Sequence, residues 1–123
     1  MIRNRIVTQL MFLLMLFLGQ NISYGTTVIV EQADSLRQII QNKQGEKKIN
    51  AQLELAMLLF ENENSEAKIV AQSALSDAKQ HKDKSILMQA FFILGRIAHE
   101  TNNINLSQTY FDSALVLSTA LTD

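Results

Sequence analysis

Residues 91–114, with the sequence FFILGRIAHETNNINLSQTYFDSA, contain the pattern that is most informative about the fold. Apolar side chains recur every three or four residues on both sides of the polar break at residues 101–103, which is typical of two amphipathic helices joined by a short turn. In this turn Asn102 can adopt the left-handed conformation and Asn103 can cap the second helix. Gly95 lies in the middle of the first helix, where it costs up to about 1 kcal/mol relative to Ala. We therefore expect another backbone to pack closely against Gly95.

The same periodicity extends over most of the chain and predicts helices at residues 32–43, 46–60, 65–81, 85–100 and 104–121. Gly45 is placed to end the first of these helices in the left-handed conformation, and Asn64 is placed to cap the third. The chain has no Pro, and only residues 26–31, TTVIVE, form a β-branched run, which we interpret as an extended lead-in. The sequence therefore predicts an all-α fold.

The helical pattern repeats along the chain. A shift of 39 residues brings Leu55-Ala56 onto Leu94-Gly95, and a shift of 40 brings the third helix onto the fifth. Two copies of one helical hairpin, at about residues 49–82 and 88–121, explain this repeat better than an irregular bundle. The residues expected to pack the hairpins together are mostly small or aromatic: Leu55, Ala56, Ala67, Ala74, Phe91, Leu94, Gly95, Ser107, Phe111 and Ala114.

The motif Phe91-x-x-Leu94-Gly95-x-x-Ala98, followed by Ser107-x-x-x-Phe111-x-x-Ala114, resembles the tetratricopeptide repeat. The first copy is a weaker match because Ala71 stands where the family has an aromatic residue. The 40-residue period exceeds the usual 34 and is typical of the long-helix variety. The resemblance covers residues 49 to about 119. It implies a short right-handed α-solenoid of antiparallel helical hairpins, with about five helices in a repeat domain over residues 32–123.

By this resemblance, the first helices of the hairpins line a concave groove that binds a protein or peptide. The residues expected to line this groove are Asn50, Leu53, Met57, Phe60, Gln89, Phe92, Arg96 and His99. Met57 and Phe92 would be adaptable apolar contacts, and Arg96 would bind a carboxylate of the partner. Large apolar residues are more often buried in a core than exposed in a groove, so a core role for Met57, Phe60 and Phe92 stays open.

The first 25 residues have the pattern of a signal peptide. Two Arg residues near the N-terminus precede a ten-residue apolar stretch at 10–19, LMFLLMLFLG, and small residues at 23 and 25 predict cleavage after Gly25. The stretch is about half the roughly 20 residues that a membrane span needs. We therefore expect an exported, periplasmic protein. The alternative is an uncleaved anchor at residues 6–19, and only in that case would the chain be attached to a membrane.

The composition argues against several kinds of chemistry. The chain has 11 Lys and Arg against 12 Asp and Glu, so it lacks the basic excess that nucleic-acid binding needs. It has no Cys, and therefore no disulfide or thiolate metal site. His81 and His99 lack zinc-protease spacing, and no Ser lies in a nucleophile elbow. We therefore expect no catalytic activity, no cofactor and no metal site.

Two functions are compatible with these features. In the first, the chain is an exported, non-catalytic protein–protein interaction module. A signal segment followed by ADSL and long-helix repeats resembles the exported N-terminal part of bacterial two-component and transcriptional regulators, which suggests a truncated sensor segment for signal transduction. In the second, the chain is a structural protein whose repeat surface only mediates oligomerisation. An apolar patch around Met57 and Phe92 would favour the first function. A patch over residues 114–121 of the C-terminal helix would favour homo-oligomerisation.

Overall fold

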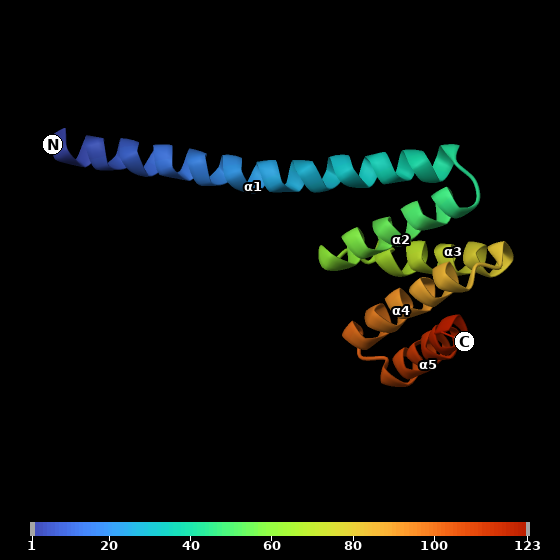
Figure 1. The fold of residues 1–123 in the computed structure, drawn as a ribbon. Coiled ribbons are helices and arrows are strands. Elements are labelled where there is room, and N and C mark those ends of the chain that lie inside the picture. Colours follow the sequence, from blue (N-terminus) through green and yellow to red (C-terminus); the bar gives the residue numbers. More distant parts are fainter. Residues whose placement is uncertain (1, 123) are drawn as a thin grey trace. The chain divides into compact units, whose positions relative to one another are not determined.

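The computed structural model describes the backbone of residues 2–122 and the side chains of residues 3–14 and 25–122. Residues 2–122 form five helices and no strand, which confirms the predicted all-α class (Figure 1). The helices are α1 (Ile2–Asn42), α2 (Glu46–Glu61), α3 (Glu66–His81), α4 (Lys84–Glu100) and α5 (Ile104–Thr122). The boundaries of α2 to α5 lie within one residue of those predicted from the periodicity.

The chain divides into two compact units, Met1–Gln32 and Ala33–Asp123. In the first unit, the large apolar side chains between Ile6 and Leu14 that the structure describes are exposed. Within the described part of the chain, every helix is too short or too polar to cross a membrane. The predicted apolar stretch at 10–19 and the cleavage signal at 23–25 lie partly outside the described side chains, so the signal segment stays a prediction.

Residues 26–31 are helical, so the prediction of an extended lead-in is wrong. β-branched residues cost only a few tenths of a kcal/mol each in a helix, and no Pro interrupts this segment. Helical residues lie on both sides of it. Propagation of an existing helix adds one hydrogen bond for each residue fixed and needs no new nucleus. The short β-branched run is therefore continuous with α1.

The turns follow the sequence signals at two Asn residues but differ at Gly45. Asn102 has a φ of 60°, as predicted. The Oδ1 atom of Asn64 accepts a hydrogen bond from the backbone N–H of Glu66 at 2.9 Å, so the predicted cap of α3 is confirmed. Gly45 has a φ of 65° but a ψ of −139°, and it directly precedes α2. Its positive φ is as predicted, but its ψ lies outside the left-handed helical region because the chain must turn into the next helix after only three residues.

The turn between the two hairpins contains a cap that the periodicity did not identify. Lys82 is the C-cap residue of α3 and has a φ of 64°, and Asp83 is the N-cap residue of α4. The Asp83 Oδ1 atom accepts hydrogen bonds from the N–H groups of Ser85 and Ile86 at 2.9 and 3.1 Å. Two backbone donors at the start of α4 are thus satisfied by one carboxylate, which also suits the positive end of the helix dipole.

The core is centred on an alanine stripe along α3. Ala67, Ala71, Ala74 and Ala78 are each at most 3% exposed. Side chains this small allow neighbouring helices to approach closely, and α3 packs against both α2 and α4. The helix α4 also packs against α2 and α5, and consecutive helices from α2 to α5 run in opposite directions (Figure 1). The helices are thus stacked in the order in which they occur along the chain.

Gly95 allows α4 and α5 to come into close contact. A Cβ atom at Gly95 would lie 2.6 and 2.7 Å from two ring carbons of Phe111 on α5. The Ser107 hydroxyl donates a buried hydrogen bond to the Gly95 carbonyl oxygen at 2.9 Å. Ala56, the equivalent residue in α2, is fully buried. The other residues expected to pack the hairpins are buried, apart from Phe91 and Phe111, which are half-buried.

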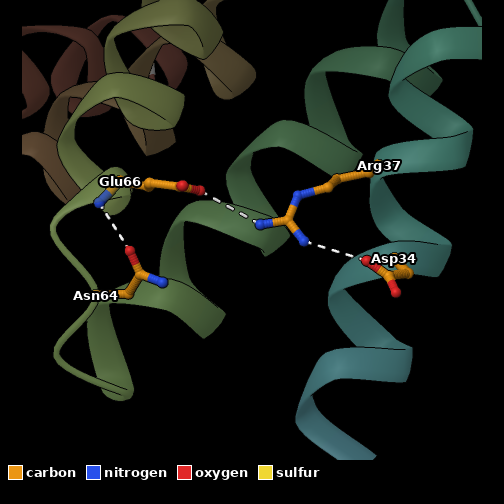
Figure 2. A network of polar contacts seen from close by, with 4 residues as sticks. All are labelled: Asp34, Arg37, Asn64 and Glu66. Carbon is orange, nitrogen blue, oxygen red and sulfur yellow. Dashed lines mark hydrogen bonds and ion pairs between the residues drawn. The ribbon is translucent and has the colours of Figure 1, made fainter.

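The last turns of α1 belong to the second unit and contribute to its core. Ala33 and Leu36 are 4% and 5% exposed and join the buried cluster. Next to them, the Arg37 guanidinium contacts Asp34 on α1 and Glu66 at the start of α3, each at 3.3 Å (Figure 2). These ion pairs are largely solvated and stabilise the fold by less than about 1 kcal/mol each. Burial of Leu36 therefore contributes more than the ion pairs to holding this segment in place.

Candidate functional site

An open groove of about 690 Å³ runs between α4 and α5, with one edge formed by Met57 of α2. The α4 wall consists of Met88, Gln89, Phe92, Ile93 and Arg96. The α5 wall consists of Phe111, Asp112, Ala114, Leu115 and Ser118. The lining is mainly apolar, with a few polar and charged side chains among it. A groove of this size and character is typical of a binding site for an apolar ligand or segment.

The groove exposes large apolar side chains on both walls. Phe92 on α4 is 51% exposed, and Leu115 on α5 is 64% exposed. The Phe92 ring packs against the Phe111 ring with a centroid distance of 5.7 Å and an interplanar angle of 51°, which holds the two walls together. Complete burial of an exposed side chain of this size is favourable by about 1.5–3 kcal/mol. An occupant that covered Phe92 and Leu115 would therefore gain a substantial part of its binding free energy from these two residues.

Arg96 lies at the edge of the groove next to α2. Its Nη1 atom is 3.7 Å from the Met57 sulfur, and its guanidinium carbon is 5.3 Å from the centroid of the Phe60 ring. Within the described residues Arg96 has no carboxylate partner. Its position over an aromatic ring orients the cation without neutralising it. Arg96 can therefore still form an ion pair with an acidic group of an occupant.

Four of the eight residues predicted to line a groove lie together in this one: Met57, Gln89, Phe92 and Arg96. Leu53 is 5% exposed and belongs to the core, so its prediction as a groove residue is wrong. The reason is that α4 packs against α2 and leaves only the Met57 edge of α2 facing the groove.

The other three predicted residues lie outside the groove. Phe60 is half-buried beneath Arg96 and borders a separate cavity near the start of α3. Asn50 and His99 are exposed and do not line the groove. The concave surface formed by the first helix of each hairpin, which the resemblance implied, is thus not the surface that forms this groove.

The α5 wall is the part of the site that the sequence analysis missed. Phe111 and Ala114 were expected to pack the hairpins together, and Leu115 was not predicted to line a groove. The signal that could have identified this wall is the 40-residue shift. It places Leu115 at the position of Leu75 and Ala114 at the position of Ala74. In the first hairpin Ala74 is buried and Leu75 is half-buried.

Outside the groove, a cluster of polar side chains lies between α2 and α3. Gln52 is 5% exposed, and its Nε2 atom donates to Asp77 Oδ2 at 3.0 Å, while the Lys48 ammonium lies 3.3 Å from the same oxygen. The Oε1 atom of Gln52 is buried with no hydrogen-bond partner among the described atoms. Within the described residues, no group of three or more His, Asp or Glu side chains is arranged to hold a metal ion. The cluster links the two helices of the first hairpin.

Comparison with protein-family models, with curated proteins and with solved structures gives no match to this chain. A function for the chain therefore has to be argued from its own residues and geometry.

Proposed function

We propose that this chain is an exported, non-catalytic protein–protein interaction module of the tetratricopeptide type, and that it binds a protein partner in the groove between α4 and α5. The observation that carries the proposal is the groove itself. Its two walls expose Phe92 and Leu115, and its edge carries Arg96, which has no carboxylate partner among the described residues. Exposed apolar surface concentrated in a groove and bordered by polar groups is typical of an interaction site.

The packing of the helices supports the solenoid part of the proposal. The helices α2 to α5 each pack against their neighbours in sequence, and α2 also packs against α4. This is the pattern of contacts expected of stacked helical hairpins. The close approach of Phe111 to Gly95 and the buried Ser107 hydrogen bond connect the residues of the motif that resembles the family. Export to the periplasm and a role as a sensor segment of a signalling regulator rest on the first 25 residues and on the resemblance.

The lining of the groove supports a non-catalytic role. Among its described residues Asp112 is the single carboxylate, and His81 and His99 lie elsewhere on the surface. General acid–base catalysis needs at least one positioned group whose proton affinity is matched to its task, and nucleophilic catalysis needs a nucleophile beside a base. The lining is suited to contact with an apolar surface.

The proposal is tested by placing a photo-crosslinking amino acid at position 92 of the full chain in cells. We expect discrete adducts with another polypeptide. The matched control places the same amino acid at Ile69, which is 66% exposed on α3 and does not line the groove. Adducts at position 92 that disappear with Leu115→Glu, and are absent at position 69, would support the module. Failure to form adducts at position 92 would contradict it.

Self-association is the second candidate function, and the exposed part of α5 favours it. Val116 is 68% exposed and Leu121 is 48% exposed, and neither lines the groove. If this face joins two copies, Val116→Glu converts an oligomer into a monomer in sedimentation velocity. In that case a photo-crosslinking amino acid at position 121, in the same exposed part of α5, gives adducts of twice the mass of the chain.

A further inference from the structure

We infer that the natural occupant of the groove is an amphipathic α-helix of a partner protein, and that it lies on α4 and α5 in the way that α4 lies on α2 and α3. This inference rests on the proposed function and specifies the kind of partner. It follows from a comparison of the two hairpins within this chain.

The walls of the groove are the second copy of a surface that is covered in the first hairpin. The repeat shifts place Met88, Phe92, Phe111, Ala114, Leu115 and Ser118 at the positions of Ile49, Leu53, Ala71, Ala74, Leu75 and Ala78. In the first hairpin five of these six residues are at most 5% exposed, and Leu75 is half-buried. The helix α4 packs against both α2 and α3 on this hairpin. In the second hairpin only Ala114 is buried. The surface that α4 covers on the first hairpin thus recurs on the second hairpin, where most of it is exposed or half-buried among the described residues.

The α5 wall keeps the features that allow a helix to approach. Ala114 is the small residue at the position of Ala74, so a neighbouring backbone can come close. Phe111 is larger than its equivalent Ala71, but its ring is packed onto Gly95. The ring therefore fills the space above Gly95 and forms part of the groove wall.

The chain itself shows what kind of helix fits such a surface. Ile86, Ala90, Ile93 and Ile97 form one stripe of α4 at spacings of four, three and four residues. All four are buried, and Ile93, at the edge of the stripe, also borders the groove. Ile97 borders the same cavity as Phe60 of α2 and Ala67 of α3, which places this stripe against the first hairpin. The opposite side of α4 faces α5 through Phe92 and Gly95. The partner helix should therefore carry three aliphatic residues and one small residue at this spacing.

The positive charge of Arg96 at the edge of the groove predicts one difference in sequence between α4 and the partner helix. Arg96 of α4 contacts Met57 and Phe60, which belong to the first hairpin. At the equivalent positions of the second hairpin stand Arg96 and His99. A cation at the place of Arg96 on an incoming helix would thus face another cation. Charge complementarity requires an acidic residue there instead, which would form an ion pair with the Arg96 guanidinium of this chain.

The test uses the full chain and a labelled peptide with the sequence of Lys84–Glu100, in which Phe92→Gln and Gly95→Gln alter two residues that contact α5. Binding is measured by fluorescence anisotropy. A second peptide adds Arg96→Glu, and a third adds Gln89→Pro, which breaks the helix at an exposed position while leaving the aliphatic stripe unchanged. The protein variants are Leu115→Glu in the groove and Ile69→Glu outside it, which replace side chains that are 64% and 66% exposed.

We expect saturable binding of the first peptide, binding about threefold tighter for the Arg96→Glu peptide, and loss of binding for the Gln89→Pro peptide. The Leu115→Glu protein should bind at least about tenfold more weakly, because a carboxylate would be buried against an apolar stripe. The Ile69→Glu protein should bind like the unchanged chain.

Several results would overturn the inference. Equal affinity for the Gln89→Pro peptide would show an extended occupant, and no saturation at about 1 mM peptide would show that the groove does not accept a helix. Unchanged affinity of the Leu115→Glu protein would place the peptide elsewhere. Self-association of the chain that is abolished by Leu115→Glu would assign the groove to a second copy. If crosslinking at position 92 still captures a partner while the peptide fails to bind, the helical occupant is wrong and the interaction module remains.

Discussion

Replacement of Gly95 by Ala tests whether the contact between α4 and α5 depends on the absence of a side chain. The new Cβ would lie 2.6–2.7 Å from two ring carbons of Phe111 and 3.1 Å from a third, so the ring has to move. An exchange of Gly for Ala in a helix interior is favourable by about 1 kcal/mol. Overpacking of a well-packed contact typically costs about 1–3 kcal/mol. We therefore expect Gly95→Ala to lower the free energy of unfolding by about 1 kcal/mol.

The sign of this effect should reverse when the ring is removed. In a Phe111→Ala background the three ring carbons nearest to the Cβ at position 95 are absent, so the helix propensity should dominate. Gly95→Ala should then raise the free energy of unfolding by about 1 kcal/mol, which gives a coupling energy of about 2 kcal/mol between the two positions. Urea denaturation followed by circular dichroism measures all four proteins of this cycle. Gly95→Leu should cost more than Gly95→Ala in the native background. Stabilisation of the native chain by Gly95→Ala, or additive effects in the cycle, would refute the close approach.

Three further predictions concern caps, buried hydrogen bonds and the equivalence of the hairpins. Ser107→Ala should lower the unfolding free energy by about 1 kcal/mol because it removes a buried hydrogen bond, whereas Ser113→Ala, which removes an exposed one, should have little effect. Asp83→Ala should cost about 1 kcal/mol through loss of the α4 cap, and Asp83→Asn should restore most of it. Ala74→Leu should cost about 3 kcal/mol because Ala74 is fully enclosed, while the equivalent Ala114→Leu, at the open groove, should cost less than about 1.5 kcal/mol. Denaturant titrations measure the free energy of unfolding for each pair of variants. Equal losses of this free energy for Ala74→Leu and Ala114→Leu would show that the groove at Ala114 is as closely packed as the core at Ala74.

Helical periodicity was sufficient to predict most of the second unit. The small packing residues Ala67 and Ala74 and the turn residue Asn102 are local signals, and the structure has Ala67 and Ala74 buried and Asn102 at a positive φ, as predicted. The prediction failed at residues 26–31, where β-branched side chains suggested an extended segment. A weak local preference was overcome there by continuation of the helix on both sides. The cap at Asp83 was missed because Asp83 lies between two charged residues, Lys82 and Lys84, in a segment without apolar periodicity.

The groove could be predicted only in part because periodicity shows which face of a helix is apolar but does not show which neighbour covers it. Leu53 and Phe92 occupy equivalent positions in α2 and α4, and both were predicted to line the groove. In the structure, Leu53 is enclosed and Phe92 is half exposed, because α4 packs against α2 whereas the surface of α4 at Phe92 opens into the groove. The α5 wall around Leu115 follows from the same repeat shift once the covered surface of the first hairpin is known.

Thiol labelling at two equivalent positions tests most directly whether the second hairpin presents an open copy of a covered helix-binding surface. The chain has no Cys, so Ala78→Cys and Ser118→Cys each introduce a single thiol. Ala78 is fully enclosed and Ser118 lines the groove. We predict slow labelling at position 78, fast labelling at position 118, and protection of position 118 alone when the helical peptide is added. Equal labelling rates at the two positions, or a thiol at 118 that stays reactive at saturating peptide, would contradict the account.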